Sequence, residues 1–203
     1  MNFVEYNVKD ANLEEILLAL KSLDTVEAVA LGGSRSTGAS DENSDYDIYV
    51  YCAEIPTAET RENLLGKYCS IAEFGNHYWE SEDNTVMNNG IPVDIIYREV
   101  DRFGRYIDTI IKGGKAFNGY TTAFWHNIKN SKVLFDKTGT FTKFRDMAQI
   151  DFPENLRSAI IKNNRNLLNG KLPSYDRQIK KAQERGDIVS VNHRITVFSR
   201  KLF

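Results

Sequence analysis

The first two thirds of the chain alternate between helical and extended hydrophobic patterns. Residues 12–23 place apolar side chains at every third or fourth position, which is the spacing of one helix face, with Asn12 as the expected N-cap. Short β-branched and aromatic runs predict strands, and Asn-Asn-Gly between two such runs predicts a hairpin. The predicted elements are helices at 12–23, 58–73, 100–114 and 121–131, strands at 26–33, 45–52 and 132–136, and a hairpin at 85–98.

The last third of the chain has helical signals in place of strand signals. Pro153 and Pro173 stand where two of these helices are expected to begin. We therefore predict an α+β fold, with a small mixed β-sheet flanked by helices in a domain at 1–136 and a helical accessory domain at 137–203. The final apolar run reaches Phe203 without a C-cap signal, which leaves open a continuation of the chain. The four predicted helices cover 140–149, 153–170, 173–187 and 188–203.

Composition places the chain among ordinary globular proteins, with 41% apolar and 27% charged residues in 203. The sequence has no apolar run long enough for a transmembrane helix and no signal-like N-terminus. Its two cysteines have no metal-like spacing. We therefore expect a cytoplasmic protein without a membrane partner. The net charge of −2 predicts no nucleic-acid partner. Residues 151–203 nevertheless carry eleven basic and five acidic residues. This asymmetry fits a basic clamp facing an acidic site, or simple attraction between the two halves.

The stretch LGGSRSTGASDENSDYDIYV at 31–50 carries two acids in a strand that is otherwise suited to a core. Side chains alternate across a strand, so Asp45 and Asp47 point the same way, with Cα atoms roughly 7 Å apart. Two such carboxylates repel each other unless a positive charge lies between them. Oxygen ligands without histidine or cysteine favour magnesium, whereas a solvated strand edge is the alternative explanation.

Two further features support a phosphate and metal site. Gly32 and Gly33 end a predicted strand and let backbone amides approach an anion, while Ser34 adds a hydroxyl donor and Arg35 a positive charge. Asp94 lies inside the apolar run IPVDIIYR, where a lone carboxylate is costly. If this strand neighbours the Asp-Tyr-Asp strand, three carboxylates converge. Three acids beside a phosphate-binding turn predict a two-metal phosphoryl- or nucleotidyl-transfer site.

These residues resemble the nucleotidyltransferase superfamily, which has the DNA polymerase β-like fold. GGSRSTG followed by SDYDIYV, with VDIIYR further on, is most similar to the small bacterial branch that holds antibiotic nucleotidyltransferases and uncharacterised nucleotidyltransferase-domain proteins. The resemblance implies that Asp45 and Asp47 hold two Mg²⁺ ions bridging the triphosphate of ATP or another nucleoside triphosphate. It also implies that Gly33 and Ser34 hold the β- and γ-phosphates. Asp94 would then bind the second ion and help deprotonate the acceptor hydroxyl.

The resemblance covers residues 26–98 and implies a transferase that moves a nucleoside monophosphate, with AMP expected, to a hydroxyl group. A small acceptor such as an aminoglycoside or lincosamide is favoured, which would make the protein an antibiotic-resistance enzyme. Adenylylation of a protein, as in toxin–antitoxin pairs, modification of tRNA, and a non-catalytic nucleotide-binding module are the alternatives. Glu80, Glu82 and Asp83 are candidates for an acceptor site, or belong to a solvated loop. The oligomeric state stays open, a homodimer included.

Overall fold

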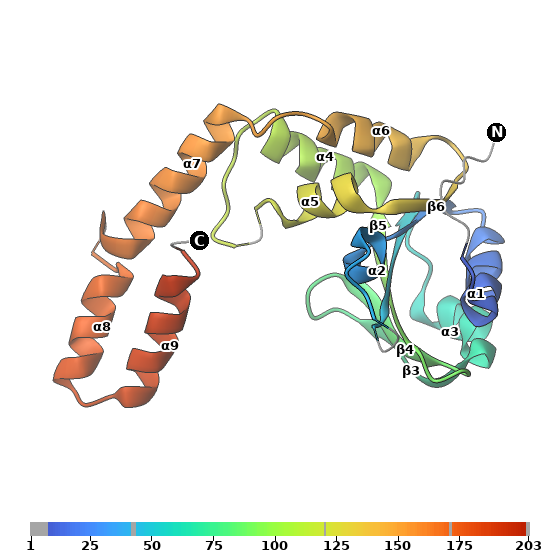
Figure 1. Cartoon of the computed structure of the whole chain (residues 1–203), viewed down its shortest axis with the longest axis horizontal. Helices are drawn as coiled ribbons and strands as arrows, with labels where there is room; N and C mark the ends of the chain where they lie inside the picture. Colours follow the sequence, from blue (N-terminus) through green and yellow to red (C-terminus); the bar gives the residue numbers. More distant parts are fainter. Residues whose placement is uncertain (1–7, 42–43, 120, 171, 202–203) are drawn as a thin grey trace. The chain divides into compact units, whose positions relative to one another are not determined.

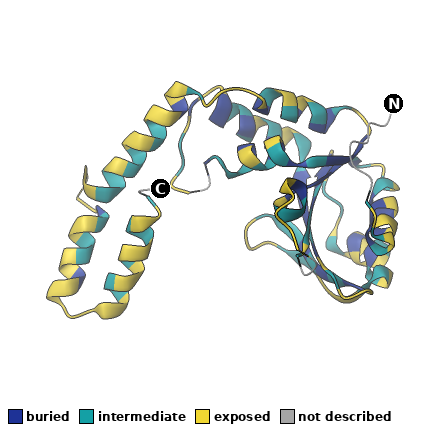
Figure 2. Ribbon diagram, in the orientation of Figure 1, coloured by how far each residue is buried: buried dark blue, intermediate teal, exposed yellow. Residues whose placement is uncertain are grey.

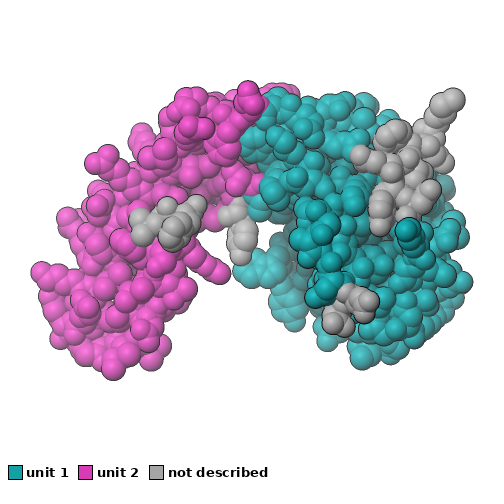
Figure 3. All heavy atoms as spheres, in the orientation of Figure 1, with its two compact units in different colours: residues 1–107, 123–150 teal, residues 108–122, 151–203 magenta. Residues whose placement is uncertain are grey.

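The computed structural model describes residues 8–41, 44–119, 121–170 and 172–201 (Figure 1). The chain divides into two compact units, coloured separately in Figure 3. Unit 1 holds the β-sheet and unit 2 is helical, so the predicted α+β class is confirmed. The units are defined by packing, and the functional division after residue 136 stays a prediction. Unit 1 comprises residues 1–107 and 123–150, and unit 2 comprises residues 108–122 and 151–203.

The six described strands of unit 1 form one mixed sheet in the order β3-β4-β5-β2-β1-β6. Among them, β2 and β5 pair in parallel, and the other neighbours pair antiparallel. This arrangement places the strand with the Asp-Tyr-Asp motif directly beside the strand with the third acid. The strands are β1 (Val26–Leu31), β2 (Tyr46–Cys52), β3 (Cys69–Asn76), β4 (Ser81–Met87), β5 (Pro92–Glu99) and β6 (Lys132–Asp136).

One face of the sheet is covered by α1 (Ala11–Lys21) and α3 (Ala58–Leu65). The N-cap prediction for α1 is wrong by two residues. The carboxylate of Asp10 accepts hydrogen bonds from the amides of Asn12 and Leu13 at 2.9 and 3.3 Å, so the helix begins earlier. The main core lies between these helices and the sheet and contains Leu13, Ile16, Leu17 and Leu20 of α1, Leu65 of α3, Ile48, Val50 and Cys52 of β2, and Val93, Ile95 and Tyr97 of β5.

The opposite face is covered by aromatic side chains near the C-terminal ends of β2 and β5. The ring of Tyr51 lies 5.4 Å from Phe103, 5.2 Å from Phe141 and 6.0 Å from Phe144, measured between ring centroids. These contacts bury the end of β2, whereas its beginning is left partly exposed. The helices that supply this cover are α4 (Val100–Ile111), α5 (Ala123–Asn130) and α6 (Thr140–Ala148).

The predicted helix at 58–73 is wrong in its second half. Helix α3 ends at Leu65, a 3₁₀ turn follows at Gly66–Tyr68, and β3 begins at Cys69. β3 is an edge strand with four of its eight residues exposed, including Ile71 at 65%, so it lacks an alternating apolar pattern. Residues 69–76 form a strand because they pair with β4, and this pairing outweighs their local preference for a helix.

Unit 2 contains α7 (Glu154–Arg165), a π-helical turn (Asn166–Gly170), α8 (Tyr175–Glu184) and α9 (Ile188–Ser199). Helix α7 starts directly after Pro153, as predicted. Leu156 and Ala182 are buried, but Figure 2 shows that most of α7 to α9 is exposed or intermediate. None of the helices in the described ranges is long and apolar enough to cross a membrane.

Candidate active site

The three predicted acids lie near the partly exposed start of β2. β2 and β5 run in parallel register with Asp47 directly opposite Asp94, so their backbones are about 4.8 Å apart. Asp45 immediately precedes β2 and lies two residues before Asp47. Asp45 is exposed, whereas the other two acids are half-buried. The register confirms that the two acid-bearing strands are neighbours.

Asp47 is the acid whose pKa this arrangement raises most clearly. Partial burial, followed by the negative charges of Asp45 and Asp94, raises the pKa of Asp47 from its usual 3.8 to about 6. The site therefore has an excess of negative charge that a cation would relieve.

The two glycines before the motif are required by close packing against β2. Gly33 opens the short helix α2 (Gly33–Thr37) with a φ of +60°, and a Cβ atom there would lie 1.7 Å from Oδ2 of Asp47. The amide of Gly32 donates to the carbonyl of Asp47 at 2.9 Å, and a Cβ at Gly32 would lie 2.4 Å from the Tyr49 ring. Thus the glycine turn lies against the carboxylate of Asp47, and Ser34 follows it, half-buried.

Arg35 has contacts that its sequence position does not suggest. Its Nε donates to the carbonyl oxygens of Ser44 and Asp45 at 3.0 Å each, and Nη2 also bonds to Ser44. The guanidinium carbon lies 4.0 Å from the ring centroid of Tyr46. Arg35 therefore holds the backbone that leads into the acidic motif. Its predicted contact with a phosphate stays a prediction.

Sequence reasoning missed Asn84, which lies on β4 directly opposite Asp94. Its Nδ2 donates to Oδ1 of Asp94 at 2.9 Å, and its Oδ1 accepts a 2.7 Å hydrogen bond from Asn76. The sequence predicts the hairpin only from residue 85 onward and leaves a solvated loop as one alternative for Glu80, Glu82 and Asp83, so this contact was not predicted. Nothing in the sequence singles out this asparagine, because residues 80–85 are all polar.

The three acids proposed for an acceptor site do not share one environment. Glu80 makes a bidentate ion pair with Arg98 at 2.7 and 2.8 Å. Asp83 is fully buried on the helix-covered face, where its carboxylate lies 3.0 Å from Arg61. Glu82 lies on the same face as Asp94 by strand pairing, and burial together with the charges of Asp94 and Glu80 raises its pKa. Of the three, Glu82 is therefore the one suited to face an acceptor bound near Asp94.

Arg98 lies further along β5 than Asp94 and contacts several side chains on the same face of the sheet. It is buried, donates to the hydroxyl of Tyr51 at 3.2 Å and to Asn127 at 3.0 Å, and lies 4.3 Å from the Tyr49 ring centroid. Burial raises the pKa of Tyr49 to about 12, although Arg98 opposes this, so the phenol stays neutral. Because Arg98 follows Asp94 by four residues in β5, the two Cα atoms are about 13 Å apart.

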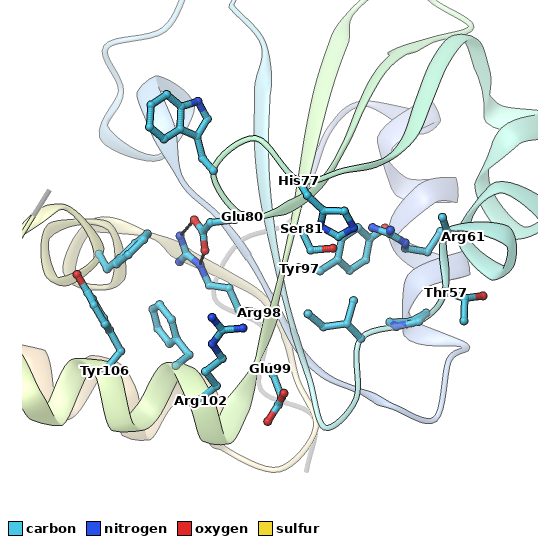
Figure 4. Close-up of a pocket in the computed structure, with 16 residues that line it drawn as sticks. Thr57, Arg61, His77, Glu80, Ser81, Tyr97, Arg98, Glu99, Arg102 and Tyr106 are labelled. Carbon is cyan, nitrogen blue, oxygen red and sulfur yellow. Dashed lines mark hydrogen bonds and ion pairs between the residues drawn. The ribbon is translucent and has the colours of Figure 1, made fainter. Parts of the chain in front are cut away.

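A pocket of about 700 Å³ lies around the Arg98–Glu80 pair, entirely within unit 1 (Figure 4). In Figure 4, this ion pair lies between His77 and Ser81 on one side and Tyr106 on the other. The volume and mixed aromatic and polar lining are typical of small-molecule sites. Its lining comprises Ile55, Pro56 and Thr57 after β2, Ala58 and Arg61 of α3, His77, Trp79, Glu80 and Ser81 near the start of β4, Tyr97, Arg98 and Glu99 of β5, Arg102, Phe103 and Tyr106 of α4, and Phe124 of α5.

The acids fit a magnesium ion in company with phosphate. In the described part of the chain, no group of three or more His, Cys, Asp or Glu side chains is arranged to hold a metal ion by itself. Magnesium is usually bound by one or two carboxylates together with substrate phosphates and water, so a complete protein cage is not required. The raised pKa of Asp47 and the glycine turn beside its carboxylate agree with such a shared site.

Paired carboxylates on neighbouring parallel strands, beside a glycine turn, are typical of enzymes that transfer phosphoryl or nucleotidyl groups. The family model described as "Nucleotidyltransferase domain" matches residues 13–117. The protein belongs to this nucleotidyltransferase family and is a transferase of nucleoside monophosphates. A search of curated proteins found no match. The residues matched by the family model include both acid-bearing strands and the glycine turn.

Proposed function

We propose that the protein uses Mg²⁺ to transfer AMP from ATP to a hydroxyl of a small molecule, such as an aminoglycoside or lincosamide. The observation that carries this proposal is the parallel register that sets Asp47 opposite Asp94. Asp45 lies two residues before Asp47, so a third carboxylate stands at the partly exposed start of β2.

Asp45, Asp47 and Asp94 are the residues that would hold two magnesium ions together with the triphosphate. When bound, magnesium neutralises the phosphate oxygens and stabilises the charge that develops on the leaving group. Asn84 donates its hydrogen bond to Oδ1 of Asp94, so Oδ2 is the oxygen that would face a metal ion. The raised pKa of Asp47 indicates that binding of a cation will be coupled to loss of a proton near pH 6.

The chain's own residues would orient the two reactants and accept a proton. Backbone amides at Gly33 and the hydroxyl of Ser34 would hold the β- and γ-phosphates. The acceptor oxygen attacks the α-phosphorus, the bond to the bridging oxygen breaks, and pyrophosphate leaves with that electron pair. Asp94 takes the hydroxyl proton as this happens. Arg35 keeps the backbone at Asp45 in place through its two carbonyl contacts.

The pocket around Arg98 supports a small acceptor over a macromolecule. Its volume of about 700 Å³ falls within the range for drug-sized ligands. A molecule that extends about 13 Å along β5 would place its body in the pocket and a hydroxyl at Asp94. Glu82 lies between these two points and would attract an amino group of the acceptor.

The first test is the melting temperature with each of the four nucleoside triphosphates, with and without Mg²⁺. A ligand at 100 times its dissociation constant stabilises the folded state by about 2.7 kcal/mol, which is readily measured. We expect a magnesium-dependent rise with one triphosphate in the wild type and none in the Asp45→Asn/Asp47→Asn variant. A matched control is Asp41→Asn, which changes an exposed acid on the same connection. An equal rise in the double variant would contradict the proposed site.

A further inference from the structure

Strand β3 contains a one-residue bulge opposite β4. Glu73 pairs with Asn84 and Asn76 pairs with Glu82, so three steps along β3 match two steps along β4. Gly75 has a left-handed φ of +83°, as expected for a bulge built on glycine. In a regular strand, residues three apart face opposite sides of the sheet. The extra residue therefore turns Asn76 toward the face that carries Asn84.

The bulge connects Asn76 to the third acid through two hydrogen bonds. Asn76 Nδ2 donates to Asn84 Oδ1 at 2.7 Å, and Asn84 Nδ2 donates to Asp94 Oδ1 at 2.9 Å. An asparagine amide has a donor end and an acceptor end, and the donor end of Asn84 faces Oδ1 of Asp94. The oxygen of Asn84 then faces the amide of Asn76. The hydrogen bond from Asn76 supports the same orientation.

A buried ion pair holds the bulge from the helix-covered side of the sheet. The amide of Gly75 donates to Oδ1 of Asp83 at 2.9 Å, and the same carboxylate lies 3.0 Å from Nη1 of Arg61. The side chains of Arg61 and Asp83 are only 2% and 0% exposed. A Cβ atom on Gly75 would lie 2.8 Å from the Cβ of Ala58, so glycine is also required by space. The bulge is thus anchored on one face and aims Asn76 on the other.

We propose that Asn84, oriented by Asn76 and the bulge at Gly75, is a positioning residue for Asp94. It holds one carboxylate oxygen of Asp94 and fixes the direction of the other. This inference rests on the proposed function, because it assigns a partner to a proposed metal ligand. Loss of such a hydrogen-bonding partner typically weakens metal binding or activity by 10–100-fold.

The test measures Mn²⁺ binding by electron paramagnetic resonance, with the uncleavable α,β-methylene analogues of the four nucleoside triphosphates tried in turn. The variants are Asn84→Leu, which keeps a branched side chain without donors, and Asn76→Ala. The control is Asn88→Ala, because the Asn88 amide bonds the carbonyl of Lys67 at 3.1 Å, away from the acids. We expect Mn²⁺ binding to weaken about tenfold or more in Asn84→Leu. A smaller loss is expected in Asn76→Ala and none in the control.

The outcomes separate the positioning role from the proposed function. If the wild type binds Mn²⁺ with an analogue and Asn84→Leu binds equally well, the inference is overturned and the proposed function stands. If the wild type binds Mn²⁺ with none of the analogues, both are overturned. Circular dichroism checks that each variant is folded. Should Asn84→Leu fail to fold, Asn76→Ala decides, since it leaves the β4–β5 pairing intact, and unchanged binding there overturns the inference.

Discussion

The two faces of strands β2 and β5 carry opposite chemistry on alternate residues. Ile48 and Ile95 face α1 and α3 and are completely buried, whereas their neighbours Asp47 and Asp94 face the other side and are half-buried. The same backbone therefore supports a core and an acidic site that are only one residue apart. Substitutions on the apolar face should change stability and leave the chemistry intact, whereas substitutions on the acidic face should have their largest effect on the chemistry.

The largest expected effect is on turnover in Asp47→Asn. The amide keeps the shape of the side chain but loses the charge that would hold a metal ion. We expect pyrophosphate release to fall by more than the 10–100-fold that loss of an indirect partner costs. Circular dichroism should show an unchanged fold. Wild-type turnover in this variant would mean that the acidic face is not the site of chemistry.

The matching change on the apolar face is Ile95→Ala, next to Asp94 in β5. Ile95 is 0% exposed, so the truncation leaves a cavity in the core. We expect the free energy of unfolding to fall by about 2–5 kcal/mol, against about 0.5–1.5 kcal/mol for Ile95→Val. Urea unfolding measures both. A loss of triphosphate binding in the folded Ile95→Val protein would show that the two faces are not separable.

Asp47 should also lower stability in a pH-dependent way. Its pKa in the folded protein is about 6, above its ordinary value of 3.8, so ionising it costs free energy as pH rises through this window. Without metal, Asp47→Asn should therefore match the wild type near pH 4 and be more stable at pH 7. We expect a gain of about 1–2 kcal/mol once solvent screening of this half-exposed group is discounted. Thermal unfolding across this range checks it, and a gain that is larger at pH 4 would refute the explanation.

The smallest effect concerns the cap of α1, on the apolar side. Asp10→Ala removes the side chain that accepts from the amides of Asn12 and Leu13, and should cost about 1 kcal/mol. Asn12→Ala should change stability by less than about 0.5 kcal/mol, because Asn12 is not the cap. Chemical denaturation of the two variants compares them directly. A reversed order would restore the cap predicted from the sequence.

The sequence pointed to those residues of the candidate site that contradict their local pattern. Asp47 and Asp94 are acids inside apolar strands, and two adjacent glycines precede the motif. Each of these features can be recognised in the sequence without knowing which strands pair. Asn84 could not be found in this way, because its meaning comes from strand pairing with β5. The β3 strand was missed for the same reason, since its exposed side chains show no alternation.

The position of β6 has a consequence for the order of events during synthesis. Both acid-bearing strands and their β4 neighbour have been made once residue 99 is complete, but the outer edge of β1 pairs with residues 132–136. At 5–20 residues per second, the ribosome needs about 2–7 s to add the intervening segment. During that interval the nascent sheet presents the unpaired edge of β1, which is open to pairing with another chain.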